Sequence, residues 1–220
     1  MKEVNFFLKT HLSTKRDYLK YMNINKPDCM TVAKKYDKDF FDGERKFGYG
    51  GYKYIPNRWD HVIEQIINHY NLNSNSKILD AGAGKGYFLS DLKKKIKSKN
   101  MFGFDISEYA INNSPKNIKD KFFVHDIRNQ LNFSDNYFDL VTCFGVIHNL
   151  AIFEIEKTLK ELIRVSKNQY LWVESYRNDR ELFNLQCWAK TCDSFFSPEE
   201  WYWLLKKFKY KGEIEFIFFD

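Results

Sequence analysis

The sequence predicts an α/β fold: a three-layer sandwich with a mostly parallel sheet between helices, preceded by an N-terminal helical lid. From about residue 71 onward, short apolar runs alternate with amphipathic stretches, which is the pattern of a parallel sheet covered by helices. A glycine-rich turn separates the first such run from the first amphipathic stretch. The length of 220 residues suits one compact domain, in which we expect residues 1–70 to form a cap or lid and residues 71–220 the main domain.

The expected elements alternate along the main domain. Residues 77–81 (KILDA) are typical of a buried strand, and residues 87–96 of a helix whose apolar side chains recur on one face. Further strands are expected at residues 100–105, 122–125, 138–144, 170–175 and 213–219. Further helices are expected at residues 62–70, 107–112, 153–165 and 198–208. The last helix begins with Ser197 as its N-cap and Pro198 at its first position.

Charge, cysteine usage and hydropathy narrow the class of protein. The net charge of +6 suggests an anionic partner, but lysines gather at residues 93–99 and 206–211, where predicted helices end and water solvates them, so we expect no nucleic acid partner. The four cysteines show neither paired spacing nor a companion histidine cluster, so we expect no metal site, no disulfides and a reducing cytoplasm. No stretch approaches the ~20 apolar residues that span a bilayer, and we expect neither a signal peptide nor a membrane anchor.

The glycine-rich turn is residues 80–86 (DAGAGKG). Its glycines allow positive φ and close approach of a ligand to the backbone, and the helix that follows offers free N–H groups. Dinucleotide-binding enzymes use G-x-G-x-x-G in this context. Here Gly86 comes one residue early, and Tyr87 stands where the third glycine would allow close helix–strand packing. The turn therefore favours S-adenosylmethionine (SAM) over a dinucleotide.

Two acidic residues follow at the ends of predicted strands. Asp105 comes about 20 residues after the turn, where a carboxylate can accept hydrogen bonds from both ribose hydroxyls. Asp126 ends the next strand, where a carboxylate can accept from an adenine amino group. A helix N-cap or turn acid is the structural alternative for Asp105 alone. The ordered set of turn and two acids indicates a nucleotide-like ligand at the carboxyl ends of the strands.

The segments KILDAGAGKG, GFDIS, VHDI and FDLVTCFGVIHN together resemble motifs I to IV of class I SAM-dependent methyltransferases, over roughly residues 60–175. The resemblance implies a Rossmann-like fold, SAM as cofactor and S-adenosylhomocysteine (SAH) as product. It implies that the methionine part meets Gly82, Ala83 and Gly84, the ribose Asp105, and the adenine Asp126 and Ile127, while Phe144 and Gly145 close a site that also includes Asp80 and Ile106. Only one strand follows the last helix, whereas the family usually closes with a two-strand hairpin, so the completeness of a seven-stranded sheet stays open.

The candidate substrate contacts lie after the later strands. His148 follows the strand at residues 138–144 and is our candidate general base, which is needed only if the methyl acceptor carries a proton. A histidine that caps the next helix or bonds to the backbone is the alternative. Tyr176 and Arg177 follow the strand at residues 170–175 and are candidates for substrate binding, with a surface arginine as the plainer interpretation. No Asp-Pro-Pro-Tyr motif, typical of nucleobase amino methyltransferases, is present.

The segment of residues 42–59 is the most distinctive part of the chain. It resembles a signature of small bacterial methyltransferases, some of them associated with surface-polysaccharide pathways. Its glycines, tyrosines and cations suit a lid that closes over cofactor and substrate, with Tyr49, Tyr52 and Arg58 as substrate contacts, although a purely structural loop is the alternative.

We therefore expect methyl transfer from SAM to a small anionic metabolite, such as a sugar, nucleotide-linked or phosphoryl intermediate of surface-glycan synthesis. O-methylation is preferred because His148 offers a base. The alternatives are an RNA methyltransferase, which requires a basic stripe with stacking aromatic side chains, and a SAM-binding partner subunit without turnover. A nicotinamide-dependent reductase is a more distant alternative.

Overall fold

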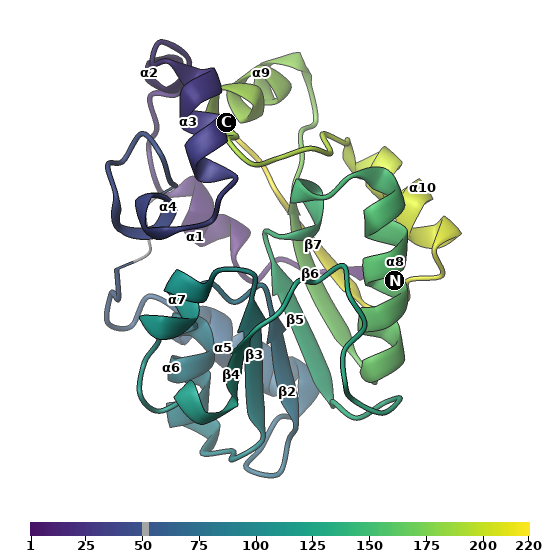
Figure 1. Cartoon of the computed structure of the whole chain (residues 1–220). Helices are drawn as coiled ribbons and strands as arrows, with labels where there is room; N and C mark the ends of the chain where they lie inside the picture. The colour runs from purple at the N-terminus through teal and green to yellow at the C-terminus, as the bar shows by residue number, and fades with distance from the viewer. Residues whose placement is uncertain (50–52) are drawn as a thin grey trace.

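The computed structural model describes residues 1–49 and 53–220, in which a central sheet carries helices on both faces (Figure 1). The described strands are β1 (Lys2–Glu3), β2 (Ile78–Ala81), β3 (Met101–Asp105), β4 (Phe122–Val124), β5 (Leu140–Phe144), β6 (Gln169–Glu174) and β7 (Glu213–Ile217). They lie in the order β1-β7-β6-β5-β2-β3-β4, and every neighbouring pair is parallel. The predicted Rossmann-like α/β fold is confirmed, with a sheet that is wholly rather than mostly parallel.

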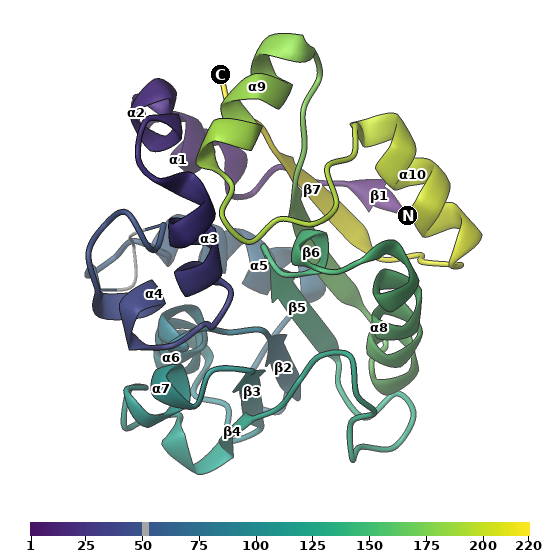
Figure 2. The same cartoon turned by 45° about the horizontal axis from the view of Figure 1, so that its top comes forward.

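The described helices are α1 (Leu8–Leu12), α2 (Tyr18–Met22), α3 (Lys26–Ala33), α4 (Lys38–Asp42), α5 (Asp60–Tyr70), α6 (Tyr87–Ile96), α7 (Glu108–Asn112), α8 (Ile152–Val165), α9 (Asp179–Trp188) and α10 (Pro198–Lys207), with 3₁₀ turns η1 (Lys119–Lys121) and η2 (Ile147–Asn149). Helices α5 and α6 pack with the sheet in one apolar core, and α8 and α10 pack in another. Figure 2 shows these two pairs on opposite sides of the strands. No element is predicted for α1 to α4 or α9, which the structure adds.

The N-terminus adds one more strand to the sheet, beside β7. Strand β1 lies beside β7, with Lys2 opposite Glu213 and Glu3 opposite Ile214, both in parallel register. The sequence leaves it open whether seven strands are present, because one strand alone follows α10. The structure supplies the seventh strand from the other end of the chain instead of from a terminal hairpin.

A buried carboxylate on β7 fixes the chain directly after β1. Glu215 is 1% exposed, and its Oε1 accepts the backbone N–H groups of Phe7 at 2.7 Å and Leu8 at 2.6 Å. The Tyr170 hydroxyl donates to Oε2 of the same carboxylate. Because Glu215 satisfies the free N–H groups at the start of α1, the side chains of Phe7 and the residues that follow have defined positions.

Helix α10 begins as the sequence predicts. Ser197 Oγ accepts the N–H of Glu200 at 3.3 Å, and Glu200 Oε2 accepts the N–H of Ser197 at 2.7 Å. Pro198 occupies the first helical turn, where its missing N–H costs no hydrogen bond. This reciprocal capping box confirms the predicted start of the helix.

The order of the strands creates a crevice between β2 and β5. From β2 the chain continues outward through β3 and β4, and from β5 it continues in the opposite direction through β6 and β7. Open α/β sheets bind ligands at such a switch point, at the carboxyl ends of the strands. The N-terminal helices lie beside this end, where α2 contacts α9 and α4 contacts α7. Within residues 1–49 and 53–220, no helix has the length and apolar character needed to cross a membrane.

Candidate active site at the switch point of the sheet

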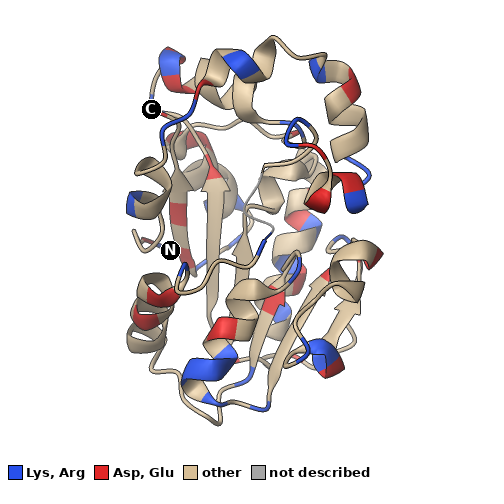
Figure 3. Cartoon of the chain, turned by 90° about the vertical axis from the view of Figure 1, so that its left-hand side faces the viewer, with Lys and Arg blue, Asp and Glu red and all other residues tan. Residues whose placement is uncertain are grey.

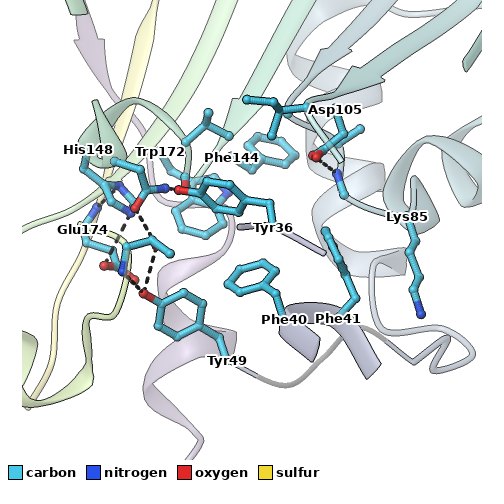
Figure 4. A pocket seen from close by; sticks show the side chains of 18 of the residues that line it. Tyr36, Phe40, Phe41, Tyr49, Lys85, Asp105, Phe144, His148, Trp172 and Glu174 are labelled. Carbon is cyan, nitrogen blue, oxygen red and sulfur yellow. Dashed lines mark hydrogen bonds and ion pairs between the residues drawn. The ribbon is translucent and has the colours of Figure 1, made fainter. Parts of the chain in front are cut away.

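A cavity of about 840 Å³ lies at the carboxyl ends of β2, β3, β5 and β6. Its size is in the range of small-molecule and cofactor sites, which span ~300–1,000 Å³. Figure 4 shows Asp105 on one side of the cavity and His148 with Glu174 on the other, with Tyr36 and Phe144 between them. The cavity therefore has two distinct ends, one beside β3 and one beside β6.

The glycine turn lines the cavity at its β3 end. Gly82 has φ +73°, and a Cβ there would lie 2.4 Å from Cγ2 of Val146. Gly86 has φ +76° and is the N-cap of α6, and a Cβ there would lie 2.4 Å from Cδ1 of Ile118. Both positions therefore require glycine for backbone conformation and for space. The predicted residues Gly82, Ala83 and Gly84 all line the cavity.

Two carboxylates lie at this end. Asp105 accepts the N–H of Gly84 on Oδ2 at 2.8 Å and the N–H of Ser107 on Oδ1 at 2.9 Å, and burial raises the pKa of its carboxyl group. Asp80 is 3% exposed, and its Oδ1 accepts the Thr142 hydroxyl at 2.8 Å. Burial raises the pKa of Asp80 to about 7. Asp105 thus holds the glycine turn as well as facing the cavity.

The predicted adenine contacts also line the cavity, but the carboxylate among them is already paired with an arginine. Ile106, Asp126 and Ile127 all reach its wall. Arg128 donates hydrogen bonds to the Asp126 carboxylate, from Nη2 to Oδ2 at 2.6 Å and from Nε to Oδ1 at 2.9 Å. These hydrogen bonds lower the pKa of Asp126. Arg128 also pairs with Glu154 at 3.0 Å. An adenine amino group would therefore share the Asp126 carboxylate with Arg128.

Four near-parallel aromatic rings form a wall toward the β6 end. Phe7 stacks on Trp59 and on Trp172, each with ring centroids 5.5 Å apart. Phe144 stacks on Trp59 at 6.1 Å and on Trp172 at 6.0 Å, which closes the cycle. Gly145 has φ +69°, and a Cβ there would lie 2.8 Å from Trp172. The faces of these rings favour a ligand with an apolar or planar part.

His148 and Glu174 meet at the β6 end. The N–H of Glu174 donates to His148 Nδ1 at 3.2 Å, and His148 Nε2 lies 3.4 Å from Glu174 Oε2. His148 is 3% exposed, and its carbonyl oxygen accepts the N–H groups of Asp193 at 3.0 Å and Ser194 at 2.9 Å. Burial lowers the pKa of His148 to about 3 and raises that of Glu174 to about 7. The structure thus places the predicted base at the cavity, with both ring nitrogens directed at Glu174.

Three arginines from the N-terminal segment, Arg16, Arg45 and Arg58, line the cavity without an ion pair to any carboxylate in the described residues. Arg16 donates to the carbonyl oxygens of His11 at 3.2 Å and Thr14 at 3.0 Å, and its guanidinium lies 5.1 Å from the Trp188 ring centroid. Arg58, a predicted substrate contact, also reaches the cavity wall. These cations leave the cavity able to accept an anionic group.

The structure describes one of the two tyrosines predicted to contact the substrate from the lid. Tyr49 lines the cavity, but its hydroxyl accepts the N–H groups of Lys190 at 2.6 Å and Thr191 at 2.9 Å, and its ring stacks on Trp188 at 5.4 Å. Burial raises the pKa of Tyr49. Its hydroxyl therefore joins the N-terminal segment to the chain after α9. Tyr52 lies outside the described residues.

Tyr176 and Arg177 are not at the cavity wall. Arg177 Nη2 lies 2.5 Å from Glu181 Oε1 and 2.7 Å from Asp220 Oδ1, and the guanidinium lies 4.3 Å from the Phe218 ring centroid. The Tyr176 hydroxyl lies 3.4 Å from Glu200 Oε2. The two residues do follow β6, but the chain turns away from the cavity into α9, whose Glu181 holds Arg177.

A contact joins α4 to the glycine turn. Lys85 Nζ lies 2.5 Å from Asp42 Oδ2, and the Tyr109 hydroxyl donates to the same oxygen at 2.7 Å. Burial disfavours the ionised form of Asp42, but the hydrogen bonds from Lys85 and Tyr109 outweigh it and lower its pKa. The ring of Phe41 lies where a Cβ on Gly84 would meet it at 3.5 Å. The last turn of α4 therefore lies directly on the predicted cofactor loop.

Several cavity residues escape prediction from the sequence. Phe7, Arg16, Tyr36 and Phe40 come from the N-terminal segment, which has no periodicity that indicates which side chains face inward. Glu174 lies near the end of the strand predicted at residues 170–175, and so at the edge of the sheet where we expect the ligand. Position alone does not show that its carboxyl group turns into the cavity.

Comparison with known proteins places the chain in a family. Residues 72–211 match the family described as "Methyltransferase domain". The ubiquinone/menaquinone biosynthesis C-methyltransferase UbiE of Rickettsia typhi is 28% identical over 159 residues, a match that covers 56% of this chain. The match spans 63% of that relative, which is less than two thirds of its length.

Solved structures share the fold. One is a complex between the Haloferax volcanii Trm112 methyltransferase activator and a candidate methyltransferase, with a TM-score of 0.52, 20% identity, and coverage of 68% of this chain and 74% of that chain. Another is geranyl diphosphate C-methyltransferase of Streptomyces coelicolor with Mg²⁺, geranyl diphosphate and SAH, with a TM-score of 0.53, 12% identity, and coverage of 66% and 58%. At these identities the likeness is one of fold. Since the family match covers more than half of the chain, the protein belongs to the methyltransferase domain family.

Proposed function

We propose that this methyltransferase modifies a small anionic metabolite, with SAM over the glycine turn and the acceptor at the β6 end of the cavity. The observation that supports this most is the set of Arg16, Arg45 and Arg58, which line the cavity without a carboxylate partner among the described residues. Arg58 is exposed and Arg16 is half-buried, so water solvates both guanidinium groups and an anionic ligand in the cavity can pair with them. The adjoining ring wall offers a surface for the apolar part of the same ligand.

The residues at the β3 end fit SAM. Positive φ at Gly82 and Gly84 leaves bare backbone toward the cavity, and Asp105 presents a carboxylate beside it. Bound SAM supplies an electrophilic methyl carbon on a sulfonium. The residues of this chain then have to align the acceptor and exclude water, which is the larger part of catalysis for such a reaction. The Asp42–Lys85 contact suits a lid at residues 42–59, which would retain the cofactor while the ring wall excludes water.

The finer identity of the acceptor rests on the sequence. Its resemblance to surface-polysaccharide methyltransferases supports a sugar, nucleotide-linked or phosphoryl intermediate of glycan synthesis, with an oxygen acceptor. A second candidate is C-methylation, which the similarity to the C-methyltransferase UbiE of Rickettsia typhi favours. The chemical linkage in the methylated product decides between the two.

An RNA substrate receives less support from the charge distribution. The lysine run at residues 93–99 begins in the last turn of α6, and the run at residues 206–211 begins in the last turn of α10. These helices pack on opposite faces of the sheet. In the view of Figure 3, basic and acidic residues are interspersed. The two lysine runs therefore do not merge into one stripe along which a phosphate backbone would bind.

Cofactor binding is the first test. Calorimetric titration of the purified protein with SAH, with NADH in parallel, is expected to show SAH binding and no NADH response. The absence of SAH binding by folded, cofactor-free protein would contradict the assigned cofactor site. RNA would be recognised in a separate titration by binding that weakens steeply with salt.

Acceptor screening is the second test. Transfer of labelled methyl from SAM is measured against phosphorylated or carboxylated sugars and their neutral counterparts. Arg58→Ala should raise the KM for an anionic acceptor about 10-fold or more, as expected for loss of a charge-assisted hydrogen bond. Arg180→Ala, which removes an exposed arginine outside the cavity, is the matched control. Equal activity on neutral and anionic acceptors, or no effect of Arg58→Ala, would contradict an anionic substrate.

A further inference from the structure

The β6 end of the cavity contains a buried carboxyl group that the fold does not fully satisfy. Glu174 is the last residue of β6 and is 9% exposed, and it lines the cavity. Its Oε2 is buried and has no hydrogen-bond partner of suitable geometry among the described residues, although His148 Nε2 lies 3.4 Å away. A buried carboxylate oxygen without a strong partner is costly, and such groups gather at functional sites.

The hydrogen bonds of His148 fix which of its nitrogens carries a proton. Nδ1 accepts the N–H of Glu174 at 3.2 Å, so the proton of the neutral ring lies on Nε2, which faces Glu174 Oε2. Burial holds the pKa of His148 at about 3, so the ring is neutral near pH 7. A ring whose Nδ1 lone pair accepts the Glu174 N–H and whose Nε2 carries the proton has no free lone pair for an acceptor's proton. His148 can orient the carboxylate of Glu174 but is poorly suited to act as the base.

The surroundings of Glu174 set when it is ionised. Burial raises its pKa most, and the indole of Trp188 and the charges of Lys190 and Arg16 lower it, which together leave it at about 7. The other titratable groups that face it are His148, Tyr18, Tyr49 and Cys192. Burial keeps the two tyrosines and the cysteine protonated, because it raises the pKa of each. A carboxyl group with a pKa near the working pH is the type suited to general base catalysis.

We propose that Glu174 is the catalytic proton acceptor for methyl transfer and that His148 is the residue that positions it, an inference that rests on the function proposed above. The acceptor's O–H, N–H or C–H bond breaks as its proton passes to a Glu174 oxygen. The electron pair left on the acceptor forms the new bond to the methyl carbon, and the carbon–sulfur bond breaks with its electrons remaining on sulfur. The products are the methylated acceptor, SAH and a protonated Glu174, which releases its proton to water.

The first experiment measures the titration of Glu174 directly and needs no acceptor. Protein labelled with ¹³C at the glutamate δ-carboxyl is titrated by NMR between pH 5 and 9 with SAH bound, and Glu174→Gln assigns the resonance. We expect Glu174 to titrate near pH 7. A Glu174 carboxyl group that is already largely ionised at pH 5, as expected from the ordinary value of 4.5, overturns the proposal. If SAH does not bind at all, the cofactor assignment fails instead, so the two failures are distinguishable.

Two substitutions of His148 separate positioning from packing. In His148→Asn the side-chain oxygen can still accept the Glu174 N–H, but the donor toward the carboxylate is lost. In His148→Gln a side-chain N–H can take the place of that donor. We expect Glu174 to titrate at higher pH in His148→Asn and near the wild-type value in His148→Gln. The same Glu174 titration in both folded variants would overturn the positioning role.

The kinetic experiment uses the acceptor found by the methyl-transfer screen. Glu174→Gln should lower kcat at least 100-fold, as expected for loss of a general base, while SAH affinity and the acceptor KM stay within threefold. We expect the kcat of the wild type to rise between pH 6 and 8, and this rise should be absent in Glu174→Gln. Glu181→Gln, at another buried glutamate that lies away from the cavity, is the control for folding. Full activity of Glu174→Gln, or a raised KM with unchanged kcat, as expected if Glu174 only binds a cationic acceptor, overturns the proposal.

Discussion

Asp80 makes the stability of this protein depend on pH in a predictable direction. Its carboxyl group is 3% exposed, and burial, with a further contribution from the charge of Asp105, raises its pKa from the ordinary 3.8 to about 7. Between these two pH values the folded chain binds more protons than the unfolded chain. The stability that this group contributes is therefore full below pH 3.8 and is lost as pH rises through about 7.

The size of the effect follows from the same two values. The difference between 3.8 and about 7 corresponds to about 4 kcal/mol at about 1.4 kcal/mol per pH unit, and about 3 kcal/mol of this falls between pH 5 and 8. Asp80→Asn preserves the size of the side chain and an oxygen that can accept from Thr142 at its 2.8 Å position, but it no longer ionises. Relative to the wild type, the variant should therefore gain about 3 kcal/mol of unfolding free energy over this range.

Urea-induced unfolding of both proteins at pH 5, 6, 7, 8 and 9 measures this difference. Asp139→Asn is the control, because burial of Asp139 is outweighed by its hydrogen bonds from Lys167 and Lys77, which lower its pKa. The stability that Asp139 contributes is lost only as pH falls below its ordinary range, so the difference from wild type should stay flat between pH 5 and 9. A wild-type minus Asp80→Asn difference that is equally flat would refute the assignment of a high pKa to Asp80.

Three further predictions concern the cofactor end of the cavity. Asp105→Ala should weaken SAH binding by about 1.5–3 kcal/mol in calorimetry, and unchanged affinity would remove Asp105 from the ribose site. Gly82→Ala places a Cβ 2.4 Å from Val146 at φ +73°, so it should lower the unfolding free energy by about 1–3 kcal/mol, and wild-type stability would show that the turn adjusts freely. Asp42→Asn should speed SAH dissociation severalfold in stopped-flow measurements because it weakens the contact with Lys85, and an unchanged rate would argue against a lid held there.

The last of these predictions has a control in the same segment. Glu44 pairs with Lys46 at 3.0 Å, and its side chain is 70% exposed. An exposed pair of this kind contributes little free energy, so Glu44→Gln should leave SAH dissociation at the wild-type rate.

The cofactor end could be predicted because its signals are local. The turn of residues 80–86 needs glycines for its φ angles, and Asp105 is the last residue of a strand whose apolar run is visible in the sequence. The start of α10 is equally local, since Ser197 and Glu200 cap each other over three residues. Where a few adjacent residues determine the conformation, the pattern and the structure agree.

The acceptor end could not be predicted because its contacts join distant parts of the chain. Strand β1 has two residues and no pattern of its own, and it is a strand only because β7 pairs with it. His148 stands at the predicted edge, but its tautomer depends on the backbone of Glu174, 26 residues further on. Arg177 follows β6 as expected, and Glu181 then holds it away from the cavity. The division into a segment of residues 1–70 and a domain of residues 71–220 stays a prediction.

The pairing of β1 with β7 has a consequence for synthesis of the protein. The hydrogen bond from Phe7 to Glu215 joins residues 208 positions apart, so neither β1 nor the start of α1 has its partner until residues 213–217 have left the ribosome. Contacts between residues so far apart in the sequence form late, because the chain loses the entropy of loop closure before these contacts stabilise it. Phe7 and Arg16 thus take their places in the cavity only after the rest of the sheet exists. A nascent chain would therefore complete the N-terminal side of the cavity last, and chains cut short before residue 213 would lack the β7 contacts that place Phe7 there.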